Sequence, residues 1–240
     1  MYVDGYNLYY GARTQCGRGT AGWRWLDIRA LARHLVSHHG GWTESWIERV
    51  VYCTARVDSN TNPSAAHDQD VYLKALLASE SVDRIEYGAY VARLKHAYLA
   101  VADPGTRKPR IHTSAWPVMV QDAHATPIPD ARFMIQYLHM EEKGSDVNVA
   151  SHLLIDIMDA RVDAAMVISN DSDLALPLEQ ARKRVPIATI NPSTSQTAGK
   201  LRGRRDEGVG RHWWWTINKN AYFACQLPDP VGNQRKPVGW

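Results

Sequence analysis

The chain has few cysteines, and their arrangement argues against two kinds of cysteine-based site. Only Cys16, Cys53 and Cys225 are present, an odd number without C-x-x-C spacing. A disulfide framework needs an even number, and a zinc knuckle needs closely spaced pairs. Unpaired thiols are typical of a reducing compartment, so we predict a cytoplasmic location.

Long apolar runs are also missing. No stretch approaches the roughly 18 residues of a membrane span, so we expect no membrane partner. We expect no signal peptide either, because the first motif already begins at Tyr2. With 240 residues, of which 45% are hydrophobic, the chain is long enough for one sizeable core.

Several common site motifs are absent as well. The glycine-rich stretch at residues 17–20 lacks both G-K-[ST] and G-x-G-x-x-G, which argues against a nucleotide cradle. No G-x-S-x-G hydrolase elbow is present. His34 and His38 have the spacing of a zinc pair, but Leu35 stands where H-E-x-x-H needs glutamate. We interpret both histidines as packed or surface residues.

Charge of one sign is scarce overall but gathers at one end. The net charge is +3, while residues 200–240 hold eight Lys and Arg against three Asp and Glu. Trp213, Trp214 and Trp215 follow this basic segment directly. Cations beside aromatic rings are typical of surfaces that bind single-stranded nucleic acid. The alternatives are a solvated segment, and tryptophans that pack along an outer strand.

Apolar spacing predicts alternating strands and helices. We expect strands near residues 1–4, 46–57, 82–91, 164–169 and 185–190. We expect helices at residues 26–39, 65–79, 145–160 and 173–183, and a turn at residues 5–7. This order predicts an α/β fold with a mainly parallel central sheet, whose ligands gather at the carboxyl ends of the strands.

Residues 92–130 interrupt this order, being rich in proline, glycine and threonine. We interpret the segment as a β-hairpin insertion, about residues 92–140, with strands near 110–120 and 131–140. The predicted domain covers residues 1–200, and residues 201–240 form a basic, tryptophan-rich extension packed on it.

Four aspartates lie where predicted elements meet. They are Asp4, Asp146, Asp171 and Asp173. The helical spacing predicts that Asp146 faces the sheet within the apolar stripe, while Asp156 lies off it. Helix capping is the alternative role for Asp146 and for one of the pair at 171 and 173, and a simple turn is the alternative at residues 4–7.

Gathered at one edge, these carboxylates would need a hard cation to offset their repulsion. Oxygen ligands favour Mg²⁺ or Mn²⁺ over zinc, so we predict one of these ions as cofactor. The ion would activate water for attack on a phosphodiester. We expect Asn7, Ser169 and Asn170 to support the acids. Lys143, Arg202, Arg204 and Arg205 are the predicted phosphate contacts, although a solvent-exposed Lys143 is an equal alternative.

Three spaced blocks together resemble the signature blocks of NYN domains, in the PIN-like nuclease superfamily. They are Tyr-Val-Asp-Gly-Tyr-Asn-Leu-Tyr-Tyr from Tyr2, Lys-Gly-Ser-Asp-Val-Asn-Val-Ala from Lys143, and Ser-Asn-Asp-Ser-Asp-Leu from Ser169. The later segments Lys200-Leu201 and Gln226-Leu227-Pro228-Asp229 resemble the tail of the LabA-like branch. The likeness covers most of the chain, leaving out the insertion and the three tryptophans.

The resemblance implies a PIN-like Rossmannoid three-layer fold and a metal-dependent ribonuclease, with the four aspartates as catalytic and metal-holding acids. We therefore expect an endoribonuclease whose partner is RNA, predicted to be single-stranded, and leave homo-oligomerisation open. One alternative is a catalytically silent RNA- or protein-binding regulatory module of the same fold. A phosphatase with an aspartate nucleophile is a weaker alternative, because it needs a second acid at position 6, which is tyrosine.

Overall fold

The computed structural model describes every residue of the chain except positions 43 and 117. The strands are β1 (Tyr2–Asp4), β2 (Val51–Ala55), β3 (Arg84–Tyr98), β4 (Ala100–Ala102), β5 (Pro109–Ile111), β6 (Met134–Lys143), β7 (Ala165–Ile168), β8 (Ile187–Asn191) and β9 (Trp213–Thr216). The α-helices are α1 (Gly5–Cys16), α2 (Ile28–Ser37), α3 (Pro63–Ala78), α4 (Ser145–Met158), α5 (Ala175–Arg182), α6 (Gly199–Arg202) and α7 (Lys219–Ala224). Two short 3-10 helices are η1 (Gly40–Trp42) and η2 (Ser172–Leu174).

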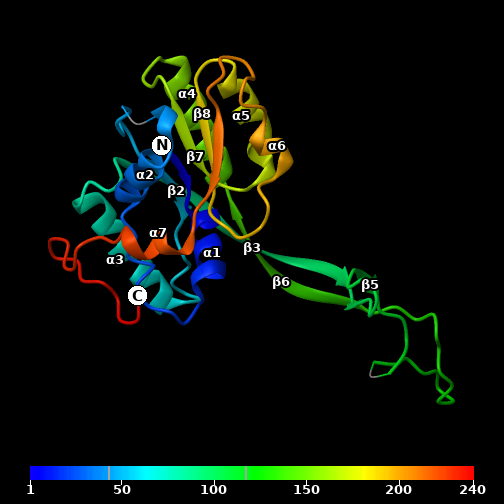
Figure 1. The fold of residues 1–240 in the computed structure, drawn as a ribbon. Helices are drawn as coiled ribbons and strands as arrows, with labels where there is room; N and C mark the ends of the chain where they lie inside the picture. The colour runs from blue at the N-terminus through cyan, green and yellow to red at the C-terminus, as the bar shows by residue number, and fades with distance from the viewer. Residues whose placement is uncertain (43, 117) are drawn as a thin grey trace. The chain divides into compact units, whose positions relative to one another are not determined.

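A seven-stranded sheet forms the centre of the fold, in the order β6-β3-β2-β1-β7-β8-β9 (Figure 1). The neighbours from β3 to β9 pair in parallel. This arrangement confirms the predicted α/β class with a mainly parallel sheet. The strand β9, from the tryptophan-rich extension, becomes one edge of the sheet.

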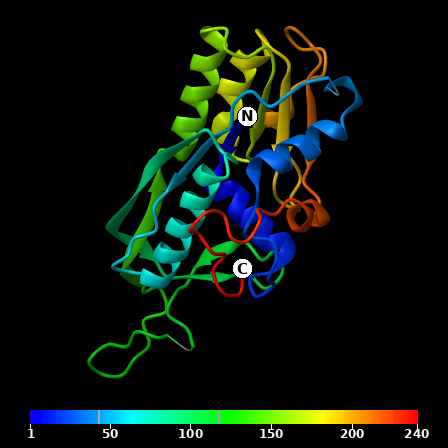
Figure 2. The ribbon, with the colours of Figure 1, turned by 90° about the vertical axis from the view of Figure 1, so that its left-hand side faces the viewer.

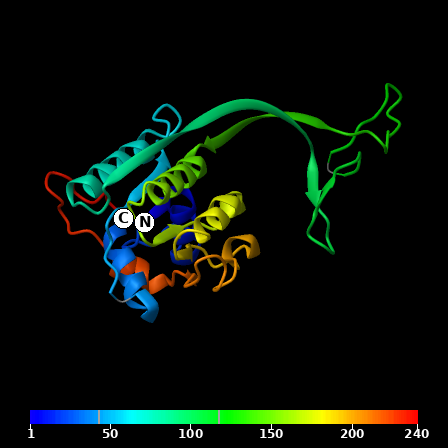
Figure 3. The same ribbon diagram turned by 90° about the horizontal axis from the view of Figure 1, so that it is seen from above.

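Helices cover both faces of the sheet, because successive strand residues point to opposite sides. Val3 and Tyr52 belong to a core with residues of α1, α2, α3 and α7, whereas Tyr2 and Val51 belong to a second core with residues of α4, α5 and α6. A view turned by 90° shows helices on either side of the sheet (Figure 2). Seen from above, α4 and α5 run side by side (Figure 3). No helix within the described residues is long and apolar enough to cross a membrane.

Val91–Glu141 forms a compact unit of its own, distinct from the unit of Met1–Tyr90 and Glu142–Trp240. It contains a two-stranded antiparallel sheet of β4 and β5. The strand expected at 110–120 is wrong over most of its described length, since β5 ends at Ile111; position 117 lies outside the described residues. The Ser114 hydroxyl accepts a hydrogen bond from the Val120 backbone N–H at 2.7 Å, which closes a loop instead of a ladder.

The turn expected at residues 5–7 is also wrong, because α1 begins directly at Gly5. The Asp4 side chain caps this helix by accepting from the Asn7 backbone N–H. Leu8, Ala12 and Cys16 recur every four residues and are buried, which is the helical spacing of a core-facing side. The other predicted helices and strands form with shifted ends; the helix expected at 173–183 begins as η2 and continues as α5.

Candidate functional site

The register of β1 against β7 places Asp4 beside Ser169 at the carboxyl edge of the sheet. Tyr2 pairs with Val167 and Val3 with Ile168, so the next residues along both strands are neighbours. The Ser169 hydroxyl donates to Asp4 Oδ2 at 3.0 Å. The topology therefore brings together two of the predicted site residues that are 165 residues apart in the sequence.

Asp4 is the most deeply buried of the predicted acids, with 3% of its surface exposed. Asp4 Oδ2 also accepts from the Asn7 side-chain amide at 2.9 Å, and Oδ1 accepts from the Asn7 backbone N–H at 3.0 Å. Burial raises the pKa of Asp4, against these hydrogen bonds and with a smaller contribution from the charge of Asp171. The result is a carboxyl group that holds its proton more strongly than an ordinary aspartate.

Asn170 joins this group to the loop at residues 192–198. The Asn170 backbone N–H donates to Asn7 Oδ1 at 3.4 Å, and its side-chain amide donates to the Ser195 hydroxyl at 3.1 Å. Asn170 Oδ1 accepts from the Ala198 backbone N–H at 2.9 Å. Asn7, Ser169 and Asn170, predicted as supporting residues, thus position Asp4 and the neighbouring loop.

Asp171 and Asp173 lie on the same edge but have different surroundings. Asp171 caps η2, since its Oδ1 accepts from the Asp173 backbone N–H at 3.0 Å, and its own N–H donates to the Ser169 hydroxyl. Asp173 is exposed. The capping alternative therefore describes what Asp171 does in the structure.

Asp146 lies in the first turn of α4 and is half-buried. The buried side of α4 carries Ser145, Val149, Leu153, Asp156 and Ile157, so the stripe that faces the sheet differs from the predicted one. Lys143 is exposed at the end of β6.

The described residues contain no group of three or more His, Cys, Asp or Glu side chains that could hold a metal ion. Asp4, Asp146, Asp171 and Asp173 thus do not form the four-acid metal site that we predicted. Two of them lie at helix N-termini as caps, where backbone N–H groups offset their charge without a cation. The predicted Mg²⁺ or Mn²⁺ site is wrong.

An exposed aromatic face lies next to Asp4. Tyr6, Tyr10 and Arg13 share one side of α1, with the Tyr6 and Tyr10 ring centroids 4.5 Å apart. Each tyrosine is about two-fifths exposed, and the Arg13 guanidinium lies 5.6 Å from the Tyr10 ring centroid. Burial raises the pKa of nearby Tyr90 to about 12, helped by Tyr10 and Tyr6. We call Tyr6, Tyr10 and Arg13 the α1 aromatic face.

The three predicted phosphate-contacting arginines of the extension fall into two groups. The guanidinium groups of Arg202 and Arg205 lie over the Trp214 ring, 5.7 and 5.3 Å from its centroid. The Arg204 side chain is 80% exposed and faces Asp206, with 3.6 Å between Nε and Oδ1. Trp213 is buried, whereas Trp215 is 47% exposed.

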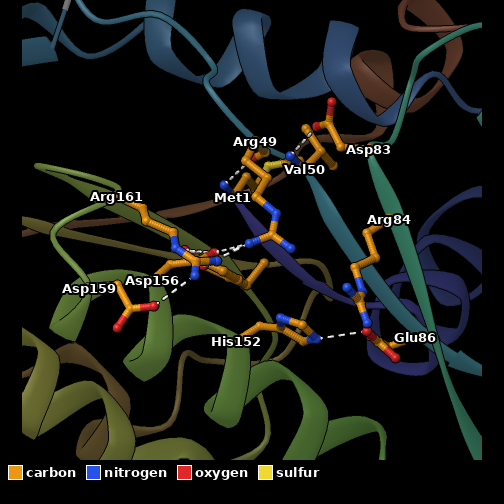
Figure 4. A network of polar contacts seen from close by, with 11 residues as sticks. Met1, Arg49, Val50, Asp83, Arg84, Glu86, His152, Asp156, Asp159 and Arg161 are labelled. Carbon is orange, nitrogen blue, oxygen red and sulfur yellow. Dashed lines mark hydrogen bonds and ion pairs between the residues drawn. The ribbon is translucent and has the colours of Figure 1, made fainter.

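Sequence reasoning missed a buried acid that has several hydrogen-bond donors around it. Asp156 is fully buried and receives Arg49 Nη1 at 2.7 Å on both carboxylate oxygens (Figure 4). The Tyr2 hydroxyl donates to Asp156 Oδ2 at 3.0 Å, and Arg161 approaches Oδ1 at 3.4 Å. In the sequence, the signal for this burial is the helical spacing of Asp156 with the apolar residues Val149 and Leu153. Asp156 and Arg49 therefore form a buried ion pair with a structural role.

Comparison with known proteins gives one informative match. No protein-family model and no solved structure matches the chain. The chain is similar to the 6-hydroxy-3-succinoylpyridine 3-monooxygenase HspA of Pseudomonas putida (strain DSM 28022 / S16). The two are 28% identical over 261 residues, an alignment that covers all of this chain and 74% of HspA.

This similarity corrects the functional expectation. HspA is named as a monooxygenase, which is an oxidoreductase and not a hydrolase. The expected metal-dependent endoribonuclease, and the silent binding module beside it, are therefore wrong, as are Mg²⁺ or Mn²⁺ as cofactor. The RNA partner and homo-oligomerisation stay predictions.

Proposed function

We propose that the chain is an oxidoreductase that adds one oxygen atom from dioxygen to a small hydroxylated aromatic ring. The observation that carries this proposal is the similarity to HspA along the whole chain. The name of that protein specifies a pyridine ring with a hydroxyl at position 6, a succinoyl group at position 3 and oxygen transfer at position 3. We infer a ring of this class, carrying a carboxylate, as the substrate.

The α1 aromatic face offers the contacts that such a ring needs. An aromatic ring gains about 0.5–1.5 kcal/mol from an offset or edge contact with tyrosine, beyond the area that it buries. Tyr6 and Tyr10 present their rings on the surface, and Arg13 lies beside Tyr10. A guanidinium group pairs well with a carboxylate, so we place the acidic side chain of the substrate at Arg13.

Asp4 is the base in this proposal. Loss of the proton from a ring hydroxyl makes the ring richer in electrons and more reactive toward an electrophilic oxygen. A carboxylate with a raised pKa accepts such a proton more readily than an ordinary aspartate. Asp4 Oδ1 accepts one hydrogen bond, from Asn7, and a carboxylate oxygen has room for a second.

Dioxygen activation needs a redox cofactor, and a flavin is one of the groups that supply this chemistry. The first β–α junction does not fit the pyrophosphate of a flavin dinucleotide. No loop separates β1 from α1, and the Asp4 carboxylate already occupies the helix N-terminus. A Cβ atom at Gly5 would lie 2.7 Å from the Tyr52 ring, so Gly5 packs against the protein instead of opening toward a ligand.

At the level of the fold, we propose a PIN-like Rossmannoid architecture of the NYN type. The parallel sheet and the aspartate at the end of β1 support this proposal. It concerns the arrangement of strands and helices, and it carries no hydrolytic activity with it.

Oxygen transfer is tested with 6-hydroxy-3-succinoylpyridine, a reduced nicotinamide nucleotide, a flavin and ¹⁸O₂. We expect one ¹⁸O atom in each product molecule, with the second oxygen atom in water and two electrons taken from the nucleotide. Asp4→Asn should lower kcat by at least about 100-fold, the range of a general base. In the wild-type protein, kcat should fall at acidic pH as Asp4 becomes protonated.

Arg13→Gln should raise KM about tenfold with little change in kcat, because it removes a binding contact. Arg33→Gln, an exposed arginine on α2, is the matched control and should change neither constant. Absence of ¹⁸O from the products of hydroxylated pyridines and phenols would contradict the proposal.

A further inference from the structure

A cavity of about 540 Å³ lies between the loop after β8 and the edge strand β9. Its walls include residues 194–197, Arg202, Arg205 and the three tryptophans of β9. The cavity is next to Asn170, which bonds Ser195 and the backbone of Gln196. Asn170 therefore connects the cavity wall to the carboxyl edge of the sheet that holds Asp4. The cavity itself is a separate site.

Two nitrogen atoms of this wall have unmet hydrogen-bonding capacity. Among the residues that the structure describes, neither Trp213 Nε1 nor Arg202 Nε has a hydrogen-bond partner, although both atoms are buried. Trp213 is 3% exposed. A buried donor without a partner is destabilising, so an acceptor from a ligand would remove this penalty.

The charge of the wall has one sign. Arg202 and Arg205 line the cavity, and its described lining contains no Asp or Glu. Thr194, Ser195 and Thr197 add residues with hydroxyl groups from the loop after β8. Another cavity, of about 750 Å³ at the amino ends of β1, β2 and β7, differs in this respect. There Arg49 and Arg161 are paired with Asp156, and Arg211 donates to the Gly41 carbonyl.

We propose that the β8–β9 cavity binds the phosphate group of a small phosphate-bearing ligand, with Arg202, Arg205 and Trp213 as its donors. These donors come from a loop, a helix end and a strand, and several charge-assisted donors suit a group with several oxygen atoms. The rings of Trp214 and Trp215 lie in the same wall and can contact an attached aromatic ring.

This ligand would be a mononucleotide such as flavin mononucleotide, which has no pyrophosphate and needs no first β–α turn. The identification as a redox cofactor rests on the proposed function, whereas phosphate binding does not. Titration in the absence of substrate and dioxygen therefore tests the cavity independently of oxygen transfer.

The experiment is isothermal titration calorimetry on the full chain with inorganic phosphate, flavin mononucleotide, riboflavin and succinate. We expect flavin mononucleotide to bind at least tenfold more tightly than riboflavin, which has the same ring without phosphate. Inorganic phosphate should bind at least tenfold more tightly than succinate. Equal affinities within either pair would overturn the proposal, as would absence of phosphate binding.

Arg202→Gln and Arg205→Gln should each weaken phosphate binding at least tenfold, and the exposed Arg205 offers a variant with little effect on folding. Arg204→Gln, which removes the same charge from the same segment, should weaken it less than twofold because that side chain faces solvent and Asp206. Equal loss in all three variants would mean attraction by net charge alone, and the cavity would not be the site.

Discussion

At the scale of single residues, Asp156 is the side chain whose loss should cost most. Removing one partner of a buried ion pair leaves the other charge without compensation, at a cost of about 3–5 kcal/mol. Asp156 is fully buried, and its partner Arg49 is 23% exposed. We expect Asp156→Ala to lower the free energy of unfolding by this amount in urea denaturation.

Asp159→Ala is the control for this experiment. Asp159 pairs with Arg161 at 2.8 Å, but its side chain is 48% exposed. A surface pair contributes at most about 1 kcal/mol. Equal losses in the two variants would show that burial does not set the strength of the Asp156 pair.

Asp4 should make stability depend on pH in the direction opposite to a salt-bridged aspartate. Burial raises the pKa of Asp4 in the folded protein, so the folded state binds this proton more tightly than the unfolded chain does. The stabilising contribution is complete below the unfolded pKa and is lost as pH rises through the folded pKa. Asp4→Asn removes the ionisation and should gain stability relative to wild type across this window.

Paired urea titrations of wild type and Asp4→Asn between about pH 4 and pH 8 measure this effect, since they span the ordinary and raised ranges of an aspartate. The quantity to compare is the difference between the two free energies of unfolding at each pH. A difference that stays constant over the range would show that Asp4 has the same pKa in both states.

At the scale of elements, Gly11 sets the distance between α1 and the loop after β8. A Cβ atom at Gly11 would lie 2.6 Å from the Pro192 carbonyl oxygen. That carbonyl also accepts from the Gln15 side-chain amide at 2.8 Å and the Tyr222 hydroxyl at 2.7 Å, which hold it in place. We expect Gly11→Ala to destabilise the fold by about 1–3 kcal/mol, the cost of overpacking.

Gly199→Ala is the matched substitution, because a Cβ atom there meets nothing within 4 Å. Its effect should stay within about 0.5 kcal/mol. Alanine favours a helix over glycine by about 1 kcal/mol, so a stabilised Gly11→Ala would mean that the Pro192 loop moves aside freely.

At the scale of the whole molecule, the two compact units differ in where their apolar residues lie. Both hydrophobic cores consist of residues from Met1–Tyr90 and Glu142–Trp240. In Val91–Glu141, large side chains such as Leu94, Trp116 and Leu138 are at least 60% exposed. The stability of the larger unit should therefore depend little on the smaller one.

Replacing Val91–Glu141 by a two-residue Asn-Gly turn tests this prediction, since the remaining chain ends lie close together: a Cβ atom at Gly88 would lie 2.5 Å from the Lys143 carbonyl oxygen. The thermal midpoint should shift by no more than about 4 °C, corresponding to ~1 kcal/mol for a protein of this size. Loss of a cooperative transition would show that the smaller unit supports the larger one.

The sequence by itself determined the alternation of helices and strands and the position of Asp4 at the end of the first strand. These features follow from local spacing, which apolar periodicity reports directly. The turn expected at residues 5–7 failed because Asp4 also caps the helix that begins there. Short acidic motifs likewise supported a metal site, although Asp4 and Asp171 act as caps in the fold.

Tertiary structure alone decided which acids are buried and which cations gather. Asp156 is buried because Arg49, 107 residues away, compensates its charge, and no local pattern encodes that pairing. Arg202 and Arg205 face a cavity while Arg204 faces solvent, because only the first two stack on Trp214. Contacts between distant residues fix the dielectric surroundings of each charge, and spacing along the chain does not contain them.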